Sequence, residues 1–145
     1  MVRVPLKHRF ELVRVMKVVR ERRELPDAIP LRGRSIQIGS SAEGNDVRLE
    51  HPCLPSLVSR THATFARDGK TRWYVMDANS TNGTFLNGKR LHAFEKHSLR
   101  QGDCITFGDR FISVQGAKLL FVPNCYSYVY QRKVKDLLII KDTPN

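Results

Sequence analysis

The stretch Ser80-Thr81-Asn82-Gly83-Thr84-Phe85-Leu86-Asn87-Gly88 contains two Asn-Gly pairs that lie five residues apart. Asn-Gly is a strong turn signal, because both residues adopt positive φ at low steric cost. The first pair is predicted to close a tight polar loop from Ala78 to Gly83, and the second to close a hairpin around Thr84–Leu86. A polar loop held between two strands presents hydroxyl and amide groups in a fixed arrangement.

The composition predicts one globular domain. The chain has 145 residues, of which 41% are hydrophobic and 27% charged, and this length suffices for a sizeable core. No apolar run approaches the roughly 20 residues that span a bilayer, and the N-terminus lacks the apolar core of a signal peptide. We therefore expect an intracellular protein that has no membrane contact.

The sequence gives little support for a metal site or for redox chemistry. Cys53, Cys104 and Cys125 are odd in number, lie far apart and form no Cys-x-x-Cys pair, so neither a disulfide framework nor a zinc site is predicted. The chain also lacks a phosphate-cradling Gly-x-x-x-x-Gly-Lys loop and a paired-carboxylate motif. We expect no metal, no cofactor and no enzymatic activity.

The net charge of +11 indicates an anionic partner without specifying which anion. The excess is concentrated at the N-terminus, where residues 1–23 hold eight Arg and Lys residues against Glu11 and Glu21.

Short β-branched segments that alternate with turn residues predict an all-β fold, an antiparallel β-sandwich of about 10–11 short strands. Ile36 and Ile38 should face the core, because they alternate with polar neighbours. Two segments stay ambiguous. The segment Phe10–Val19 fits both a strand and a helical face, and 133–140 has the pattern of a helix. The expected strands are Phe10–Val19, Ser35–Ile38, Val47–Leu49, His62–Ala66, Arg72–Met76, Thr84–Leu86, Ile105–Phe107 and Lys118–Val122.

Four polar residues stand where strands meet loops. Ser59, Arg60, Thr81 and Asn82 supply two hydroxyls, a guanidinium and a carboxamide. If their loops share one end of the sandwich, these groups converge as a phosphate site requires. The alternative is that the hydroxyls cap local turns and that Arg60 is a solvated surface charge.

From about Ile36 to Gly108 the chain resembles the forkhead-associated (FHA) domain. The resemblance rests on the order and spacing of five motifs: Ile38-Gly39, Asn45-Asp46-Val47, Ser59-Arg60-Thr61-His62, Thr81-Asn82-Gly83 and the segment from Gly102 to Gly108. It implies that residues 1–122 form an FHA-like sandwich. Residues 123–145 would then be a C-terminal extension, in which Tyr126, Tyr128 and Tyr130 form an added edge strand or begin a linker.

The resemblance implies a phosphothreonine-peptide site. In the family, the residue matching Ser59 binds the phosphate and the residue matching Arg60 lines the same site. The residues matching Thr81 and Asn82 hold the peptide backbone. The residue matching His62 is structural, and Gly39 and Gly83 belong to the structural motif.

One position departs from the family pattern. After the glycine that matches Gly39, the family usually carries an arginine that contacts the phosphate, and this chain has Ser40. Losing a charge-assisted donor costs about 1.5–3 kcal/mol. Three interpretations follow: another cation such as Arg34 or Arg60 substitutes, the site binds weakly, or it has changed to unphosphorylated ligands.

The resemblance favours a phosphopeptide-binding module that recognises phosphothreonine-containing proteins, as the adaptor part of a larger nuclear signalling protein. The alternative is a basic interaction domain that binds nucleic acid or unphosphorylated protein through a degenerate phosphate site. Favouring it is the charge of +11; against it, no nucleic-acid-binding motif is present. The oligomeric state stays open.

Overall fold

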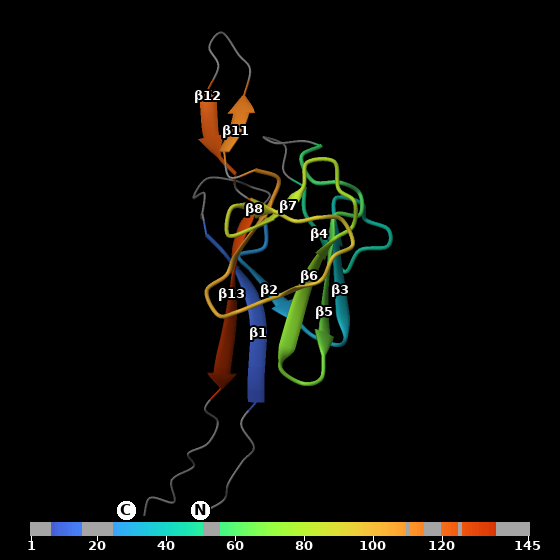
Figure 1. Cartoon of the computed structure of the whole chain (residues 1–145), viewed down its shortest axis with the longest axis vertical. Helices are drawn as coiled ribbons and strands as arrows, with labels where there is room; N and C mark the ends of the chain where they lie inside the picture. Colours follow the sequence, from blue (N-terminus) through green and yellow to red (C-terminus); the bar gives the residue numbers. More distant parts are fainter. Residues whose placement is uncertain are drawn as a thin grey trace, which may run out of the picture.

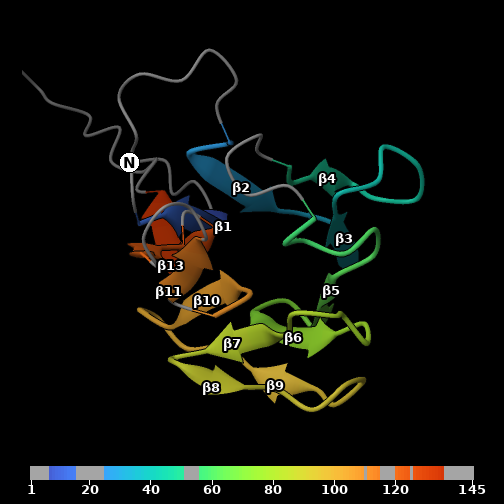
Figure 2. The ribbon, with the colours of Figure 1, turned by 90° about the horizontal axis from the view of Figure 1, so that it is seen from above.

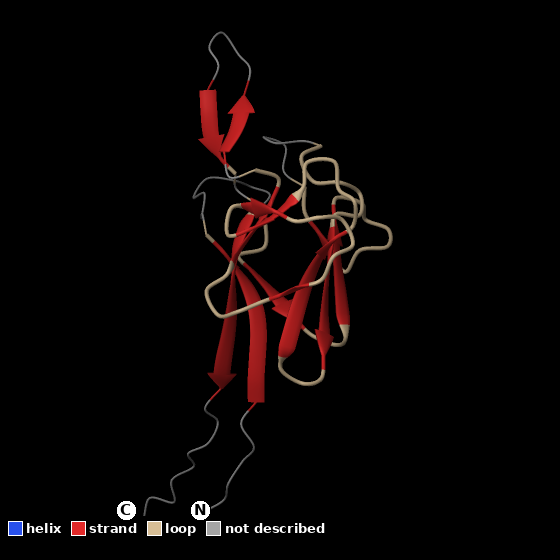
Figure 3. Ribbon diagram, in the orientation of Figure 1, coloured by secondary structure: helices blue, strands red, loops and turns tan. Residues whose placement is uncertain are grey.

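The computed structural model describes residues 7–15, 25–50, 56–109, 111–114, 120–124 and 126–135. Within these ranges the chain forms thirteen strands and no helix (Figure 3). The strands are β1 (Lys7–Arg14), β2 (Ala28–Leu31), β3 (Ser35–Gly39), β4 (Val47–Arg48), β5 (Ala63–Asp68), β6 (Arg72–Asp77), β7 (Thr84–Leu86), β8 (Lys89–Arg90), β9 (His97–Ser98), β10 (Cys104–Phe107), β11 (Phe111–Val114), β12 (Leu120–Pro123) and β13 (Ser127–Lys135).

Two sheets form the layers of a β-sandwich (Figures 1 and 2). One has six strands in the order β2-β1-β13-β10-β7-β8, and the other has five in the order β4-β3-β5-β6-β9. The paired strands run antiparallel except β3 and β4, which are parallel. The predicted all-β sandwich is therefore confirmed, with one parallel pair that the sequence pattern did not indicate.

The core lies between the inward faces of the two sheets. Ile36 and Ile38 are buried as predicted, because alternate residues of a strand point to opposite faces. Aromatic rings join the layers: Phe65 of β5 lies edge-on to Phe107 of β10, and Trp73 of β6 lies against Phe10 of β1. These contacts fix the spacing of the sheets and thereby the positions of the loops at their ends.

The C-terminal strand is central to its sheet, and this corrects the expectation of an edge strand or linker. β13 pairs with β1 on one side and with β10 on the other. Tyr126, Tyr128 and Tyr130 are buried, so their period of two reflects a core-facing strand. The predicted helix over 133–140 also needs correction, because residues 133–135 continue β13. Residues 136–140 lie outside the described ranges.

Other predicted strands also differ from the observed ones at their bounds, and two of them need comment. β1 confirms a strand at Phe10–Arg14, whereas Val18 and Val19 lie outside the described residues. The strand expected at 118–122 corresponds to β12, whose partner β11 was not predicted. Figure 1 shows this hairpin projecting from the sandwich. Among the described residues, no helix is long and apolar enough to cross a membrane.

The second Asn-Gly pair closes the β7–β8 hairpin, as predicted. Leu86 pairs with Lys89, which leaves a two-residue turn. Asn87 has φ of 52° and Gly88 has φ of 83°. Positive φ at both central residues is the geometry of a type I′ turn, whose twist matches that of the flanking strands.

Candidate functional site

Three loops meet at one end of the sandwich, the upper end in Figure 1. One follows β3, another precedes β5, and the third follows β6. The Ser40 amide donates to the Ser59 carbonyl at 2.9 Å, and the Thr81 amide donates to the Ser59 hydroxyl oxygen at 3.0 Å. The structure therefore brings Ser40, Ser59 and Thr81 together, as the predicted site requires.

His62 is buried and holds two of these loops together. Its Nδ1 accepts a hydrogen bond from the Ser59 amide at 3.0 Å, so the proton of the neutral ring lies on Nε2, which donates to the Gly83 carbonyl at 2.9 Å. Burial lowers the pKa of His62 below 6.5, although the Gly83 carbonyl and Asp77 oppose this shift. A neutral ring bonded at both nitrogens supports the structural role that the resemblance implied.

Gly39 is required by close backbone contact. A Cβ atom at this position would lie 2.0 Å from the Arg60 carbonyl oxygen and 2.9 Å from Nδ2 of Asn45. The Asn45 amide donates to the Arg60 carbonyl at 2.7 Å and to the Ser41 carbonyl at 2.9 Å. Asn45 thus ties the loop after β3 to the segment that carries Ser59, a role that its motif did not reveal.

Gly83 lies in a crowded position with φ of 86°. Its carbonyl accepts hydrogen bonds from both His62 and the Gly108 amide. A Cβ atom would lie 2.7 Å from Nε of Arg90, and the Arg90 guanidinium donates to the Thr81 carbonyl at 3.3 Å. Arg90, which the sequence analysis did not single out, therefore braces the Thr81–Gly83 turn from the outside.

The buried carboxylate of Asp77 holds the loop after β6 through hydrogen bonds. Asp77 is 3% exposed and accepts hydrogen bonds from the Ser80 amide, the Ser80 hydroxyl and the Thr84 hydroxyl. Asp77 therefore connects the two ends of the Ser80–Thr84 segment. Sequence reasoning missed it, and the one available signal was its place before a run of short hydrogen-bonding side chains.

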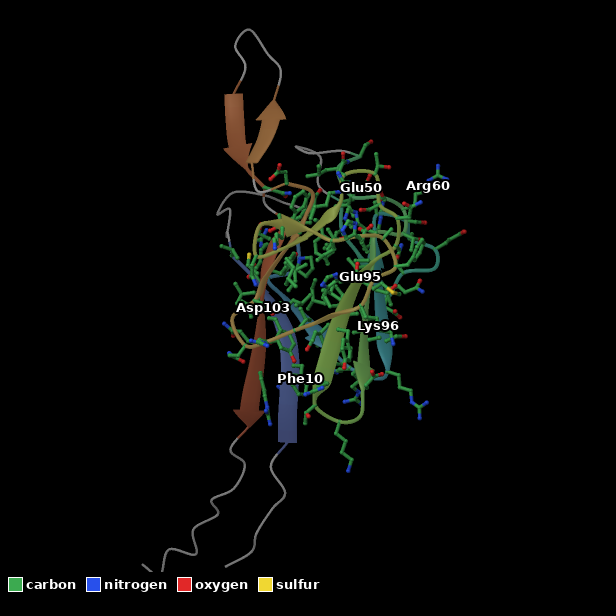
Figure 4. The ribbon with its side chains drawn as sticks, in the orientation of Figure 1. Phe10, Glu50, Arg60, Glu95, Lys96 and Asp103 are labelled. Carbon is green, nitrogen blue, oxygen red and sulfur yellow. The ribbon has the colours of Figure 1, made fainter. Side chains whose placement is uncertain are left out.

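The residues predicted to contact the ligand are more exposed than the buried His62, Gly83 and Asp77. Asn82 is half-buried, and its amide donates to the Leu57 carbonyl at 2.9 Å. Thr81 and Arg60 are exposed, and Figure 4 shows Arg60 and Glu50 at the same end of the molecule. Among the described residues, the Arg60 guanidinium has no hydrogen-bond or ion-pair partner.

Arg34 lies at the opposite end of the sandwich. It precedes β3 and accepts a backbone hydrogen bond from Arg67 near the end of β5, and it lines a hollow with Arg67, Asp68 and Gly69. At about 3.3 Å per residue, the length of β3 separates Arg34 from Ser40 by roughly 17–20 Å. The idea that Arg34 substitutes for the family arginine is therefore incompatible with the geometry.

A family model for the FHA domain matches residues 36–108, which is half of the chain. The protein therefore belongs to the FHA family. Domains of the FHA family are binding modules that recognise phosphorylated motifs, and they are not catalytic.

The chain is also similar to two named ligases. It is 40% identical over 67 residues to the Saccharomyces cerevisiae E3 ubiquitin-protein ligase DMA2, covering 42% of this chain and 13% of that one. It is 37% identical over 65 residues to the human E3 ubiquitin-protein ligase RNF8, covering 45% and 13%. The chain thus spans only about an eighth of the length of these relatives.

The solution structure of the FHA domain of an Arabidopsis thaliana hypothetical protein superposes with a TM-score of 0.58 at 25% identity, covering 85% of this chain and 84% of that one. This similarity extends well beyond the residues of the family match and shows that the flanking strands share the FHA fold.

Proposed function

We propose that this domain binds phosphothreonine-containing peptides at the end formed by Ser40, Ser59, Thr81 and Asn82. The observation that carries the proposal is the convergence of the Ser59 and Thr81 segments, held together by the buried His62. Hydrogen bonds already join these loops in the free domain, which reduces the ordering entropy lost on binding.

The hydrogen bonds of the free domain leave suitable groups for a ligand. The Ser59 hydroxyl oxygen already accepts from the Thr81 amide, so the Ser59 proton remains to be donated to a phosphate oxygen. The Asn82 amide nitrogen is occupied by the Leu57 carbonyl, and its Oδ1, which has no partner among the described residues, remains to accept a peptide N–H. A phosphate and the adjoining backbone would thus find complementary groups.

The test is a titration of the domain with a phosphothreonine peptide library and with its unphosphorylated counterpart. We expect binding only to the phosphorylated library, with a loss of about tenfold or more in Ser59→Ala, because a charge-assisted hydrogen bond is removed. Equal affinity for both libraries would refute the proposal. Matched phosphoserine peptides should bind severalfold more weakly, since burying one methyl group contributes about 0.8 kcal/mol.

The nucleic-acid alternative rests on the charge of +11. The basic residues near the N-terminus that could bind nucleic acid include Arg3, Lys7, Arg9, Arg14 and Lys17. Arg14 is buried and forms an ion pair with Asp27 at 2.9 Å, so it is not available to a nucleic-acid phosphate. Titration with duplex DNA separates the two functions. Tight DNA binding without a preference for phosphorylated peptide would favour the alternative.

We also propose a cellular setting for the domain. Its similarity to segments of DMA2 and RNF8 supports a role as the adaptor part of a larger, intracellular and nuclear signalling protein. Localisation of the full-length product by tagging would test this.

A further inference from the structure

We propose that Arg48 provides the phosphate-binding cation that position 40 lacks. This inference rests on the proposed function, because it names a specificity-determining residue of the same site. Arg48 was not a candidate from the sequence, in which it lies eight residues after Ser40. The parallel pairing of β3 with β4 makes the two neighbours.

The register places Arg48 beside the loop that follows β3. Arg48 pairs with Gly39, and its Nε donates to the Ser40 carbonyl at 2.8 Å. The Ser40 amide in turn donates to the Ser59 carbonyl. Ser40 therefore links the Arg48 guanidinium to the segment that carries Ser59, the residue predicted to bind the phosphate. Arginine suits this task because its planar fork binds two phosphate oxygens.

Three other arginines near these loops or strands fit the role less well. Arg34 lies at the far end of β3. Arg90 donates to the Thr81 carbonyl and lies against Gly83, so its guanidinium is engaged in bracing the turn. Arg60 follows Ser59 directly, and its exposed side chain has no described partner that would orient it. Only Arg48 is both exposed and fixed to the Ser40 loop among these four.

Glu50 holds Arg48 in the free domain. The Arg48 guanidinium forms an ion pair with the Glu50 carboxylate, and the two side chains are 56% and 46% exposed. An ion pair this exposed is weak. A phosphate dianion carries more charge than a carboxylate and offers three acceptor oxygens, so it would displace Glu50. Exchange of Glu50 for phosphate leaves the Nε contact with Ser40 in place.

The primary experiment compares Arg48→Ala with Arg34→Ala by calorimetric titration with a phosphothreonine peptide selected from the library. Both variants lose one positive charge, but only Arg48 lies at the site. We expect affinity to fall about tenfold or more in Arg48→Ala and less than about twofold in Arg34→Ala. Thermal melting of each variant checks that the fold is retained, as an exposed position predicts.

Two further variants separate a direct cation from a residue that merely positions the loop. Glu50→Gln should bind the phosphopeptide severalfold more tightly, because it removes a competitor for Arg48 and a negative charge near the phosphate. Adding Ser40→Arg to Arg48→Ala should restore affinity, and the gain should exceed that of Ser40→Arg alone, because neighbouring residues with a shared role are not additive.

Equal affinities of Arg48→Ala and Arg34→Ala would overturn the assignment of Arg48, as would a failure of Ser40→Arg to rescue Arg48→Ala. In both cases the parent chain would still prefer the phosphorylated peptide, so the proposed function would stand. Absence of that preference in the parent chain would instead refute the proposed function itself.

Discussion

The two Asn-Gly turns of this domain share a dipeptide and differ in almost everything that surrounds it. Gly83 and Gly88 have nearly the same φ, 86° and 83°. In the second turn Asn87 also has positive φ, which closes a two-residue hairpin, whereas Asn82 does not. Local sequence therefore accounts for the hairpin turn but only partly for the turn at the site.

The two turns also differ in the contacts that hold them. Gly83 is buried, and its carbonyl is bound by His62 and Gly108, which are distant in sequence. Gly88 is exposed. The Asn82 amide donates to the Leu57 carbonyl in the segment before β5, a strand of the other sheet, whereas the Asn87 side chain bonds to Asp103 and Cys104 at the start of β10, in the sheet that holds the hairpin. Among the described residues, the first turn is therefore bonded to segments of both sheets, and the second turn to its own sheet.

The largest effect is expected from His62→Ala, which removes the link between the first turn and the Ser59 segment. The substitution leaves a cavity and an unpaired Ser59 amide, so the free energy of unfolding should fall by about 2–4 kcal/mol, and phosphopeptide binding should fall with it. Denaturant unfolding measures the former and calorimetry the latter. The exposed His92, replaced in the same way, is the control and should change neither.

The second prediction compares Gly83→Ala with Gly88→Ala. Each introduces a side chain at positive φ, which costs about 1–2 kcal/mol. Gly83→Ala should cost roughly 1 kcal/mol more, because its Cβ would lie 2.7 Å from Arg90 Nε and 3.1 Å from the Phe85 ring. Urea unfolding of the two variants gives the difference. Equal losses would show that crowding at the first turn does not matter.

Much of the fold was accessible from the sequence because it depends on local patterns. Alternation predicted the burial of Ile36 and Ile38, and Asn87-Gly88 predicted its hairpin. The positions of Ser59 and Thr81 at strand ends indicated that they would converge if their loops share one end of the sandwich. In each case the relevant interactions lie within a few residues, or follow from the rule that neighbouring strand ends share an edge.

The rest depends on which strands become neighbours. A period of two at Tyr126–Tyr130 indicates a strand with one buried face, but it does not say that the strand inserts between β1 and β10. Arg34 precedes β3, the strand that ends at the site. It is only six residues from Ser40 in the sequence, but the whole length of β3 separates the two in space. Arg48 became a neighbour of Ser40 only through the parallel pairing of β3 and β4.

The third prediction separates binding from stability at the two asparagines. Asn82→Ala should reduce phosphopeptide affinity about tenfold, because Oδ1 no longer accepts from the peptide and the Leu57 segment loses its contact. Its unfolding free energy should change by less than about 1 kcal/mol. Asn87→Ala should do the reverse: lose about 1 kcal/mol of stability with affinity unchanged within twofold, since its side chain bonds only within the hairpin's own sheet. Loss of affinity in both variants would remove the distinction.

The smallest expected effect is a pH dependence confined to the first turn. Burial lowers the pKa of His62 in the folded domain below its value of 6.5 in the unfolded chain. Below about pH 6.5 the unfolded chain therefore binds more protons than the folded one, and linkage requires stability to fall as the pH is lowered. Protonation would also place a second donor proton on Nδ1, which now accepts from the Ser59 amide.

Between pH 7.5 and pH 6 this contribution is less than about 1 kcal/mol, because only part of one proton is taken up on unfolding. Amide-exchange protection factors resolve it locally: protection at Gly83 and Thr84 should fall over this range relative to protection at Gly88 and Lys89. His62→Asn, although less stable throughout, should show no such relative change. A parallel decline at both turns in the parent chain would mean that another group titrates, and that His62 does not give the first turn a pH response of its own.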